Sequence, residues 1–424
     1  MNFNLSTFQI SSTLQYYFSQ LHYFSLFLLA LLLPYWGAWK IMKLLLLVIF
    51  ISSLFSGKVS VKALLTNKVI MALFTFIFLT YISFLWSPAD VVFSEEFKMA
   101  INRYKYFFLL IPGIYFSSLS KKRIKNIIFI MALAPIGTAV VYYLNSFGIT
   151  DIYPIVYGGD SRIFVHYLAN NFFLTFSGIY FLHLSLNTFI KKEFKEFTLF
   201  FILFVLFVSS MVIDPRMSSR LTLLVFIVVA LITPLFYLKR KHSIILFIIS
   251  VMFLALFMNT NPKMKQGINT FKTAIEENKY TGSWGHRLGF LIVGIDIFKE
   301  HPVMGRGVSD VRARVVAYSE ENPEYFIKDP ARHFHNEHLH ILVEIGIVGY
   351  LIYLSFIFLF LNIPISDPLL NKLKYTYTIA FLLMQFGEHY LMFYATSLFI
   401  CIFFILVILY GERDNEEQTK TITT

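Results

Sequence analysis

Long apolar runs recur along nearly the whole of this 424-residue chain, separated by short segments that carry most of its charges. A helix of roughly 17–25 mostly apolar residues can cross a bilayer, and such a helix satisfies its own backbone hydrogen bonds within lipid. The pattern predicts an all-α polytopic membrane protein with about twelve transmembrane helices. The twelve runs are residues 23–39, 41–55, 69–86, 106–119, 127–144, 171–186, 197–213, 221–238, 244–258, 339–363, 375–386 and 391–410.

The composition agrees with membrane lipids as the main surroundings. Only 14% of the residues are charged and 57% are hydrophobic, whereas soluble domains carry about 25% charged residues. The formal net charge of +11 is spread over the loops between apolar runs, so we expect no nucleic-acid partner. The single cysteine, Cys401, excludes an intrachain disulfide.

Basic residues in short loops predict the orientation, because loops rich in Lys and Arg stay in the cytoplasm. The short loops on one side carry 15 basic residues and those on the other side carry 8. We therefore expect both termini in the cytoplasm and the loop at residues 259–337 outside, which in a Gram-negative cell is the periplasm. The expected organisation is nine membrane helices in residues 1–258, a periplasmic loop at 259–337, three membrane helices in 338–410 and a cytoplasmic tail at 411–424.

The loop at residues 259–337 is the one large hydrophilic segment, and it is too long for an idle connector. Apolar residues recur at helical spacing over residues 262–278, 286–299 and 308–319. We expect three amphipathic helices that lie at the outer membrane–water boundary and cap the bundle. The short polar segment from Gly411 is expected to be disordered.

Two arginines precede the run at residues 221–238. Asp214 and Pro215 are suitable as an N-cap and a first-turn residue, so Arg216 and Arg220 would share one helix face. Two guanidinium groups at a helix N-terminus form an anion site suited to phosphate. The alternative is that both side chains only anchor the helix end at the membrane surface.

Further basic residues lie on the same expected side. Arg287, at the start of the second amphipathic helix, could add a third positive charge at a phosphate. Arg306, between two glycines, could bind an anion with its backbone and side chain, although a plain turn is the simpler interpretation. Arg103 and Lys105, at the outer end of the fourth run, are weaker candidates for the same basin.

Histidines gather where the loop meets the run at residues 339–363. If a helix begins near His335, then His335 and His338 share one of its faces. A neutral imidazole at the mouth of the bundle can accept a proton from a sugar hydroxyl, which favours His335 as a base. Glu344 is expected to hydrogen-bond to a neighbour and orient the site. The histidine spacing is not a familiar zinc motif, so we expect no metal; the four histidines are His333, His335, His338 and His340.

These residues carry a resemblance to the superfamily of O-antigen ligases and O-antigen polymerases. Three motifs occur in the right order around one large external loop. Gly346 and Gly349, in the last motif, are also expected to allow close helix packing. The motifs are Ser219-Arg220, then Gly285 and Arg287 followed by Ile297, Phe298, Lys299, Pro302, Gly305 and Gly307, and finally His335 and Asn336 followed by Leu339, Leu342, Glu344, Gly346 and Gly349.

The resemblance implies an integral inner-membrane glycosyltransferase that takes a glycan from undecaprenyl diphosphate on the periplasmic face. Ligases pass the glycan to lipid A–core, polymerases pass it to another repeat unit, and related enzymes pass it to protein. Carried over by motif, Arg220 and Arg287 would hold the donor diphosphate, and His335 would activate or position the acceptor hydroxyl. Neither a metal nor another cofactor is implied. The remaining candidates are Arg216 at the diphosphate and, in supporting positions, His338, Asn336 and Glu344.

The acceptor stays open at this point. We favour a ligase, because one dominant external loop carries the histidines, whereas polymerases often use two sizeable external loops and the segment at residues 145–166 is short. A repeat-unit polymerase is the main alternative, followed by a protein O-oligosaccharyltransferase and a polysaccharide transporter. A transporter should carry charges at the membrane midplane and a repeat between its halves, and neither is clear in the sequence.

Overall fold

The computed structural model describes residues 11–56, 59–87, 102–152, 165–213, 219–238, 262–307, 311–323 and 333–423, with Lys98 and scattered positions between 241 and 260. Every regular element over these residues is helical. In chain order they are α1 (Ser12–Leu32), η2 (Trp36–Ala38), α2 (Trp39–Ser56), α3 (Val61–Thr66), α4 (Lys68–Ile82), η3 (Ser83–Trp86), α6 (Phe107–Tyr115), α7 (Lys121–Leu133), α8 (Ile136–Ser146), α9 (Tyr167–Ile190), α10 (Phe194–Ile213), α11 (Arg220–Ile232), η4 (Thr233–Phe236), α13 (Pro262–Glu277), α14 (Gly282–Glu300), α15 (Val311–Glu321), α16 (Glu337–Leu361), α17 (Pro368–Met384) and α18 (Tyr394–Thr423).

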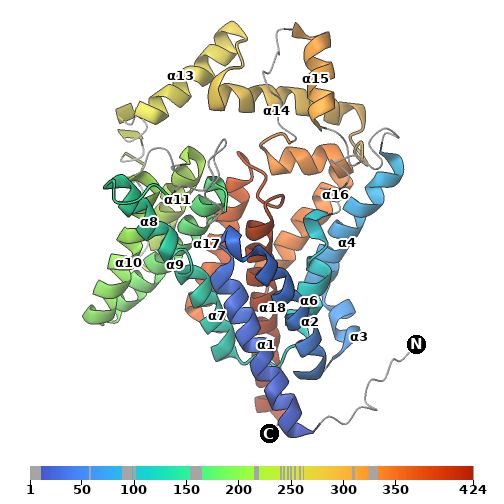
Figure 1. Cartoon of the computed structure of the whole chain (residues 1–424), viewed down its shortest axis with the longest axis vertical. Helices are drawn as coiled ribbons and strands as arrows, with labels where there is room; N and C mark the ends of the chain where they lie inside the picture. Colours follow the sequence, from blue (N-terminus) through green and yellow to red (C-terminus); the bar gives the residue numbers. More distant parts are fainter. Residues whose placement is uncertain are drawn as a thin grey trace.

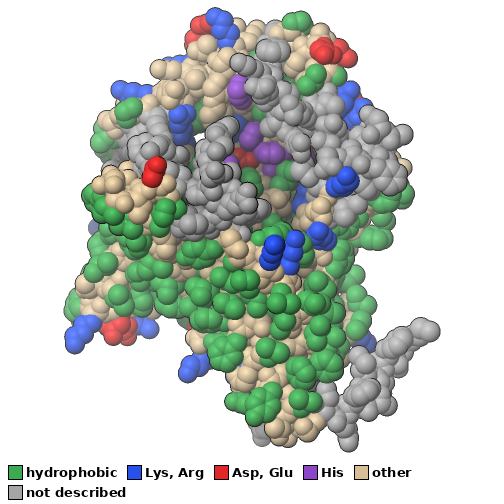
Figure 2. Space-filling model, in the orientation of Figure 1, with side chains coloured by type: hydrophobic (Ala, Val, Ile, Leu, Met, Phe, Trp, Pro, Cys, Tyr) green, Lys and Arg blue, Asp and Glu red, His purple; other side chains and the backbone are tan. Residues whose placement is uncertain are grey.

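The predicted all-helical membrane fold is confirmed in its main features. Within the described residues, seven helical stretches are long and apolar enough to cross a membrane. Apolar side chains cover the sides of the bundle (Figure 2), as expected for a surface in contact with lipid. The seven stretches are Trp39–Ser56, Lys68–Trp86, Lys121–Ser146, Tyr167–Ile190, Phe194–Ile213, Glu337–Leu361 and Tyr394–Thr419.

The bundle is arranged around α18, which is buried along nearly its whole apolar length (Figure 1). A helix that is apolar on every side is expected at such a central position. Helices α13, α14 and α15 form a separate layer across one end of the bundle, and α18 ends at the opposite end. This outer layer confirms the three helices predicted within residues 259–337.

One predicted span contains a break, and one predicted helix start was wrong. The run at residues 127–144 consists of two helices, α7 and α8, which meet at Pro135, a residue without the backbone N–H that a continuous helix needs. Helix α11 begins at Arg220 with Ser219 as its N-cap, whereas Asp214 was predicted as the N-cap. The run at residues 244–258 lies largely outside the described residues.

The segment after Gly411 was predicted to be disordered, and this was also wrong. Helix α18 continues to Thr423. Its polar end contacts other parts of the bundle: the hydroxyl of Tyr115 donates to Glu412 (2.7 Å), and the backbone N–H of Ser366 donates to Asp414 (2.7 Å). These contacts order a segment that has too few apolar residues to fold by itself.

The outer layer packs on the first half of α16 through a small apolar core. This core joins α14 to the segment that carries the histidines, so the two parts of the candidate site are held against each other. Its buried members are Phe290, Val293, Ile297, Val315, Phe334, Leu339 and Val343.

A break in α16 fixes this packing. Gly346 has φ 65° and ψ −169°, far from helical values, and the turn at residues 302–307 after α14 fills the gap. Four backbone hydrogen bonds join the turn to α16, where the break leaves N–H and C=O groups without helical partners. They are Arg306 N to Val343 O (2.8 Å), Gly307 N to Glu344 O (2.9 Å), Ile347 N to Pro302 O (2.9 Å) and Val348 N to Val303 O (3.2 Å).

The spacing of Gly346 predicted a glycine that allows close helix packing, and this prediction was wrong. A Cβ atom at this position would lie 2.2 Å from the carbonyl oxygen of Val303, and one at Gly305 would lie 2.5 Å from the backbone of Glu344. Both glycines also have positive φ, which only glycine adopts readily. The backbone N–H of Arg306 donates to α16, and its side chain pairs with Glu300. Both contacts agree with the simpler interpretation, in which Arg306 belongs to a plain turn.

Candidate active site

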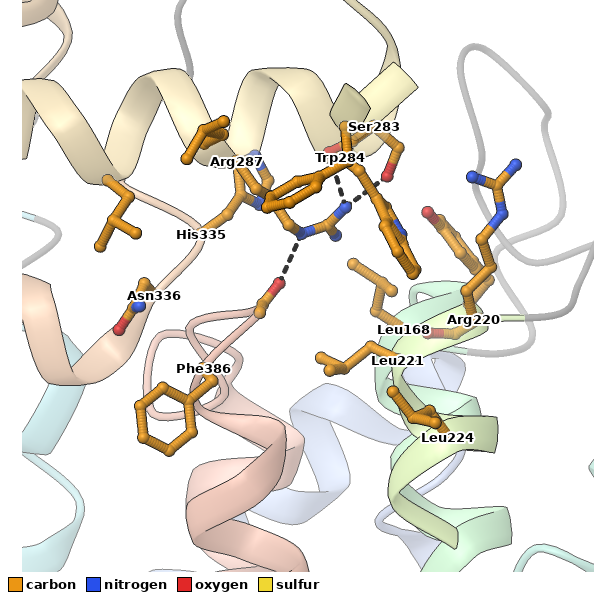
Figure 3. Close-up of a pocket in the computed structure, with 16 residues that line it drawn as sticks. Leu168, Arg220, Leu221, Leu224, Ser283, Trp284, Arg287, His335, Asn336 and Phe386 are labelled. Atoms are coloured by element: carbon orange, nitrogen blue, oxygen red, sulfur yellow. Dashed lines mark hydrogen bonds between the residues drawn. The ribbon is translucent and has the colours of Figure 1, made fainter. Parts of the chain in front are cut away.

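A cavity of about 420 Å³ lies between the outer layer and the bundle, where the sequence motifs meet. Arg220, Arg287, His335 and Asn336 all line it (Figure 3). Figure 2 shows histidine and acidic side chains inside a hollow on this face. The other lining residues are Tyr167, Leu168, Ser219, Leu221, Leu224, Phe271, Ser283, Trp284, Leu288, Leu291, Phe386 and Gly387.

The cavity has an apolar side and a cationic side. Leu168, Leu221 and Leu224 lie below the two arginines in the view of Figure 3. Leucines provide no hydrogen-bonding groups, so this side suits a hydrocarbon chain, whereas the guanidinium groups suit an anion. The arrangement therefore fits a ligand with a lipid part joined to a charged part.

Arg287 is oriented by its own neighbours. Its Nε donates to the carbonyl oxygen of Gly387 (3.0 Å), and its Nη1 donates to the carbonyl oxygen of Ser283 (3.0 Å) and contacts that residue's hydroxyl. Its Nη2 makes no hydrogen bond to the described part of the chain. The guanidinium plane is thus fixed, with one edge left to bind a ligand oxygen.

Arg220 is the first residue of α11, where the helix N-terminus adds positive potential. Its Nη2 donates to the amide oxygen of Gln266 on α13 (2.9 Å). Neither Arg220 nor Arg287 forms an ion pair with a carboxylate of the described residues. Two uncompensated cations in one cavity are the expected form of an anion site.

His335 lies just before α16 and not within it, which corrects the predicted helix start. Its φ is 49°, and the next residue, Asn336, is the N-cap that accepts a hydrogen bond from the backbone N–H of Leu339 (3.0 Å). Positive φ in a residue other than glycine is uncommon and often marks a functional position. The imidazole is partly exposed to the cavity.

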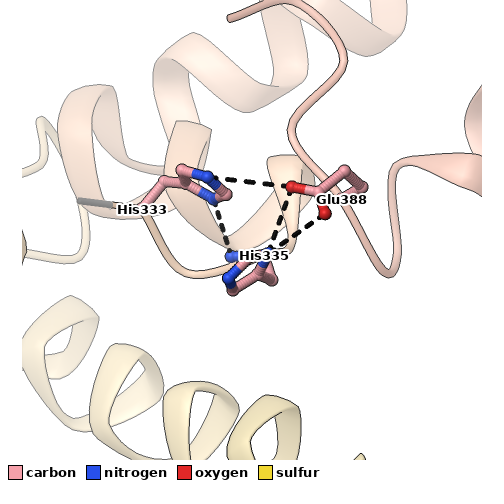
Figure 4. Close-up of side chains that lie close together, drawn as sticks. All are labelled: His333, His335 and Glu388. Carbon is pink, nitrogen blue, oxygen red and sulfur yellow. Dashed lines mark hydrogen bonds and ion pairs between the residues drawn. The ribbon is translucent and has the colours of Figure 1, made fainter. Parts of the chain in front are cut away.

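Glu388 orients the imidazole of His335 (Figure 4). The Nδ1 of His335 lies 3.1 Å from each carboxylate oxygen of Glu388. Burial acts to raise the pKa of Glu388, but the hydrogen bond from His335 and the electrostatic attraction of the nearby imidazoles and of Arg287 outweigh it and lower the pKa to about 2. The carboxylate is therefore ionised, holds the proton on Nδ1 and leaves Nε2 of His335 as the acceptor.

His333, His335 and Glu388 are close enough to hold a metal ion, with their candidate ligand atoms within 4.8 Å of one another. The hydrogen-bond pattern disfavours it. The Nδ1 of His333 accepts from the backbone N–H of His335 (3.2 Å), which puts the proton of the neutral ring on Nε2, the atom that faces Glu388. The nearest nitrogens of both rings thus carry protons, and a metal needs them free.

Two other sequence candidates do not line the cavity. The Nε2 of His338 lies 3.1 Å from the carbonyl oxygen of Leu382, and its Nδ1 lies 3.2 Å from the hydroxyl of Tyr350. Arg103 is buried and donates to Glu344 (2.9 Å), so it is neutralised and was wrongly predicted to join the positive basin.

Glu344 supports the site from a distance. Besides Arg103, it lies 2.9 Å from His340 Nε2, and the ring of His340 stacks edge-on against His389, with 4.4 Å between the ring centres. His389 is the neighbour of Glu388 in sequence. Arg216 lies outside the described residues.

The match to known families comes from the part of the chain that builds this site. Residues 197–354 match the family model described as O-antigen ligase. This match supports the resemblance to the superfamily of O-antigen ligases and polymerases. The matched region contains α11, the outer layer and the first half of α16, which together carry Arg220, Arg287 and His335. A search of curated proteins finds no match to the chain.

Glu388 lies beyond the matched region and was not among the predicted site residues. The signal that could have found it is an acidic residue directly before a histidine, between two apolar runs, since ionisable groups at such positions are rarely unused.

Proposed function

We propose that this protein is an O-antigen ligase that transfers a glycan from undecaprenyl diphosphate to lipid A–core. The proposal rests on two guanidinium groups that have no ion pair among the described residues and on a carboxylate-oriented imidazole, which meet in one cavity with a leucine-lined side. The superfamily acts on lipid-linked glycans, and each part of such a donor has a matching part of this cavity.

In the proposed reaction, Arg220 and Arg287 bind the diphosphate, and the polyprenyl chain extends along the leucines. The acceptor hydroxyl attacks the anomeric carbon while its proton moves to Nε2 of His335. The bond from the anomeric carbon to the diphosphate oxygen breaks, and undecaprenyl diphosphate leaves with the bonding electron pair. Direct attack inverts the anomeric centre, and the arginines stabilise the charge that develops on the leaving group.

The reaction needs no cofactor. The guanidinium groups supply the positive charge that a metal would otherwise provide, and Glu388 stabilises the imidazolium that forms on His335. The proposal includes the membrane arrangement predicted above: about twelve spans, both termini in the cytoplasm and residues 259–337 in the periplasm of the inner membrane. The cavity would then open at the periplasmic face, where the acceptor lies.

The test is glycan transfer by the purified protein in detergent, with a polyprenyl-diphosphate glycan as donor and lipid A–core as acceptor. Arg220→Ala and Arg287→Ala should abolish transfer, and His335→Ala should lower it at least about 10²-fold. Glu388→Gln should lower it about 10–100-fold, as is typical for a group that orients a reacting side chain.

Arg314→Ala is the matched control, because Arg314 also lies on the outer layer but pairs with Glu300. It should transfer at the wild-type rate. Wild-type transfer by either cavity-arginine variant would contradict the diphosphate assignment for that residue. A protein that moves the donor across vesicles but forms no product in detergent would be a transporter.

A repeat-unit polymerase is the second candidate, because it would use the same donor and the same cavity. A surface-polysaccharide gel of a deletion strain separates the two. Bare lipid A–core with polymer accumulated on the carrier indicates a ligase, and core that bears single repeats indicates a polymerase.

A further inference from the structure

A second depression lies beside the cavity, between α13 and the start of α14, with a volume of about 440 Å³. Most of the residues that line this groove have side chains with hydrogen-bonding groups. Its described lining consists of hydroxyl, amide and ammonium side chains together with one proline: Pro262, Lys265, Gln266, Asn269, Thr270, Thr273 and Thr281.

Several of these polar groups have unused hydrogen-bonding capacity. Thr281 is the N-cap of α14, yet its hydroxyl makes no capping bond. The side chains of Asn269 and Thr273 make no hydrogen bond to the described part of the chain. Amides and hydroxyls both donate and accept hydrogen bonds, so the groove matches a ligand rich in hydroxyl groups, such as a sugar chain.

The groove and the cavity share a wall. Gln266 lines the groove and accepts the hydrogen bond from Arg220, which lines the cavity. Gly267 packs against Trp284 so closely that a Cβ atom would lie 2.9 Å from the ring. A diphosphate bound at the arginines therefore has leucines on one side and this polar groove close to the other.

We infer that the groove binds sugar units of the donor glycan beyond the sugar attached to the diphosphate. The inference rests on the proposed function, since it takes the diphosphate to lie at Arg220 and Arg287. The lipid part of the donor lies along the leucines, and the glycan leaves the arginines along α13. The groove then determines which glycans are transferred, while the cavity performs the reaction.

The experiment compares two donors with the purified protein in detergent. One is a polyprenyl diphosphate with a single sugar, and the other carries a multi-sugar glycan that begins with the same sugar. Asn269→Ala combined with Thr273→Val should raise KM for the long donor about tenfold, because two hydrogen bonds of ordinary strength are lost. KM for the short donor and kcat for both donors should stay unchanged.

A second variant, Asn269→Trp, fills the groove and should exclude the long donor while the short donor is still transferred. Lys272→Ala is the matched control, because Lys272 is exposed on the same helix but does not line the groove. It should behave as wild type with both donors.

The inference is overturned if the groove variants change KM equally for both donors, or for neither. If the wild type transfers neither donor, the proposed function fails and the inference with it. Transfer of the short donor by the groove variants, with unchanged KM for the long donor, leaves the proposed function intact and removes only the groove.

Discussion

The break in α16 gives the sharpest test of how this site is held together. Replacing Gly346 with alanine adds one Cβ atom, which would lie 2.2 Å from Val303 O, 2.4 Å from Val303 C and 2.6 Å from Gly305 N. All three are backbone atoms, so no side-chain rotation relieves the overlap. The turn at residues 302–307 must therefore move away from α16.

The magnitude follows from what the movement removes. A non-glycine residue in this backbone conformation costs about 1–3 kcal/mol. Undocking the turn also removes four backbone hydrogen bonds, each worth about 1 kcal/mol. The sum, about 5–7 kcal/mol, is comparable with the total stability of many domains, so we expect the turn to undock locally while the bundle stays folded.

The functional consequence comes from the position of the turn. It follows α14, which carries Arg287, and it docks on α16, which His335 precedes. Undocking therefore loosens Arg287 relative to His335, and a misplacement of about 1 Å in an active site can cost about 10²-fold in rate. Gly346→Ala should lower transfer by about this factor while the protein still inserts and accumulates.

Hydrogen exchange provides the direct measurement. The amides of Arg306, Gly307 and Ile347 should exchange faster in Gly346→Ala than in the wild type. Gly148→Ala is the control, because Gly148 also has positive φ (69°) but has nothing within 4 Å of its added Cβ; it should cost only about 1–2 kcal/mol and leave transfer intact. Wild-type exchange and transfer in Gly346→Ala would refute the coupling.

Three further predictions concern charges. Glu344→Gln leaves the buried Arg103 without its counter-charge and should destabilise the protein by about 3–5 kcal/mol; an unchanged Tm would show that the pair is not needed. Burial lowers the pKa of His333 to about 3 from an ordinary 6.5, so the neutral ring stabilises the fold fully above pH 6.5. This stability is lost as the pH falls towards 3, by about 2 kcal/mol at pH 5, and His333→Asn should show a smaller drop in Tm from pH 7.5 to pH 5. EDTA should leave transfer unchanged, because the ring nitrogens of His333 and His335 that lie nearest Glu388 carry protons and are not free to bind a metal. Strong inhibition by EDTA would contradict this.

The parts of the structure that depend on local pattern could be predicted from the sequence. Apolar runs of sufficient length identify helices such as α9 and α10, because lipid leaves the backbone few alternatives. The spacing of apolar residues found the outer helices, including α14. Motif order placed Arg220, Arg287 and His335 together, and the structure brings all three to one cavity.

Features that depend on distant partners could not be predicted. Glu388 meets His335 across 53 residues, and Arg103 meets Glu344 across 241 residues. Two glycines three residues apart, such as Gly346 and Gly349, are compatible both with a closely packed helix face and with a break in the helix. Only the neighbouring turn, whose backbone approaches Gly346 to 2.2 Å, distinguishes the two.

The presence or absence of a counter-charge separates the arginines that support the fold from those that are available to a ligand. An isolated buried charge is strongly unfavourable, so Arg103 is held by Glu344 beneath the site, and Arg306 and Arg314 are held by Glu300 on the outer layer. From the sequence alone, these three arginines cannot be distinguished from the two arginines that line the cavity.

Arg220 and Arg287 differ because their fixed hydrogen bonds go to neutral oxygens, those of Gln266 and Gly387. Neutral acceptors orient a guanidinium without cancelling its charge, so both cations keep their full attraction for an anion in surroundings of low dielectric constant. The same reasoning applies to His335, where Glu388 compensates the charge that appears only after the proton is taken. The arginines are therefore oriented for an anion before it binds, and the carboxylate of Glu388 is in place before His335 takes up a proton.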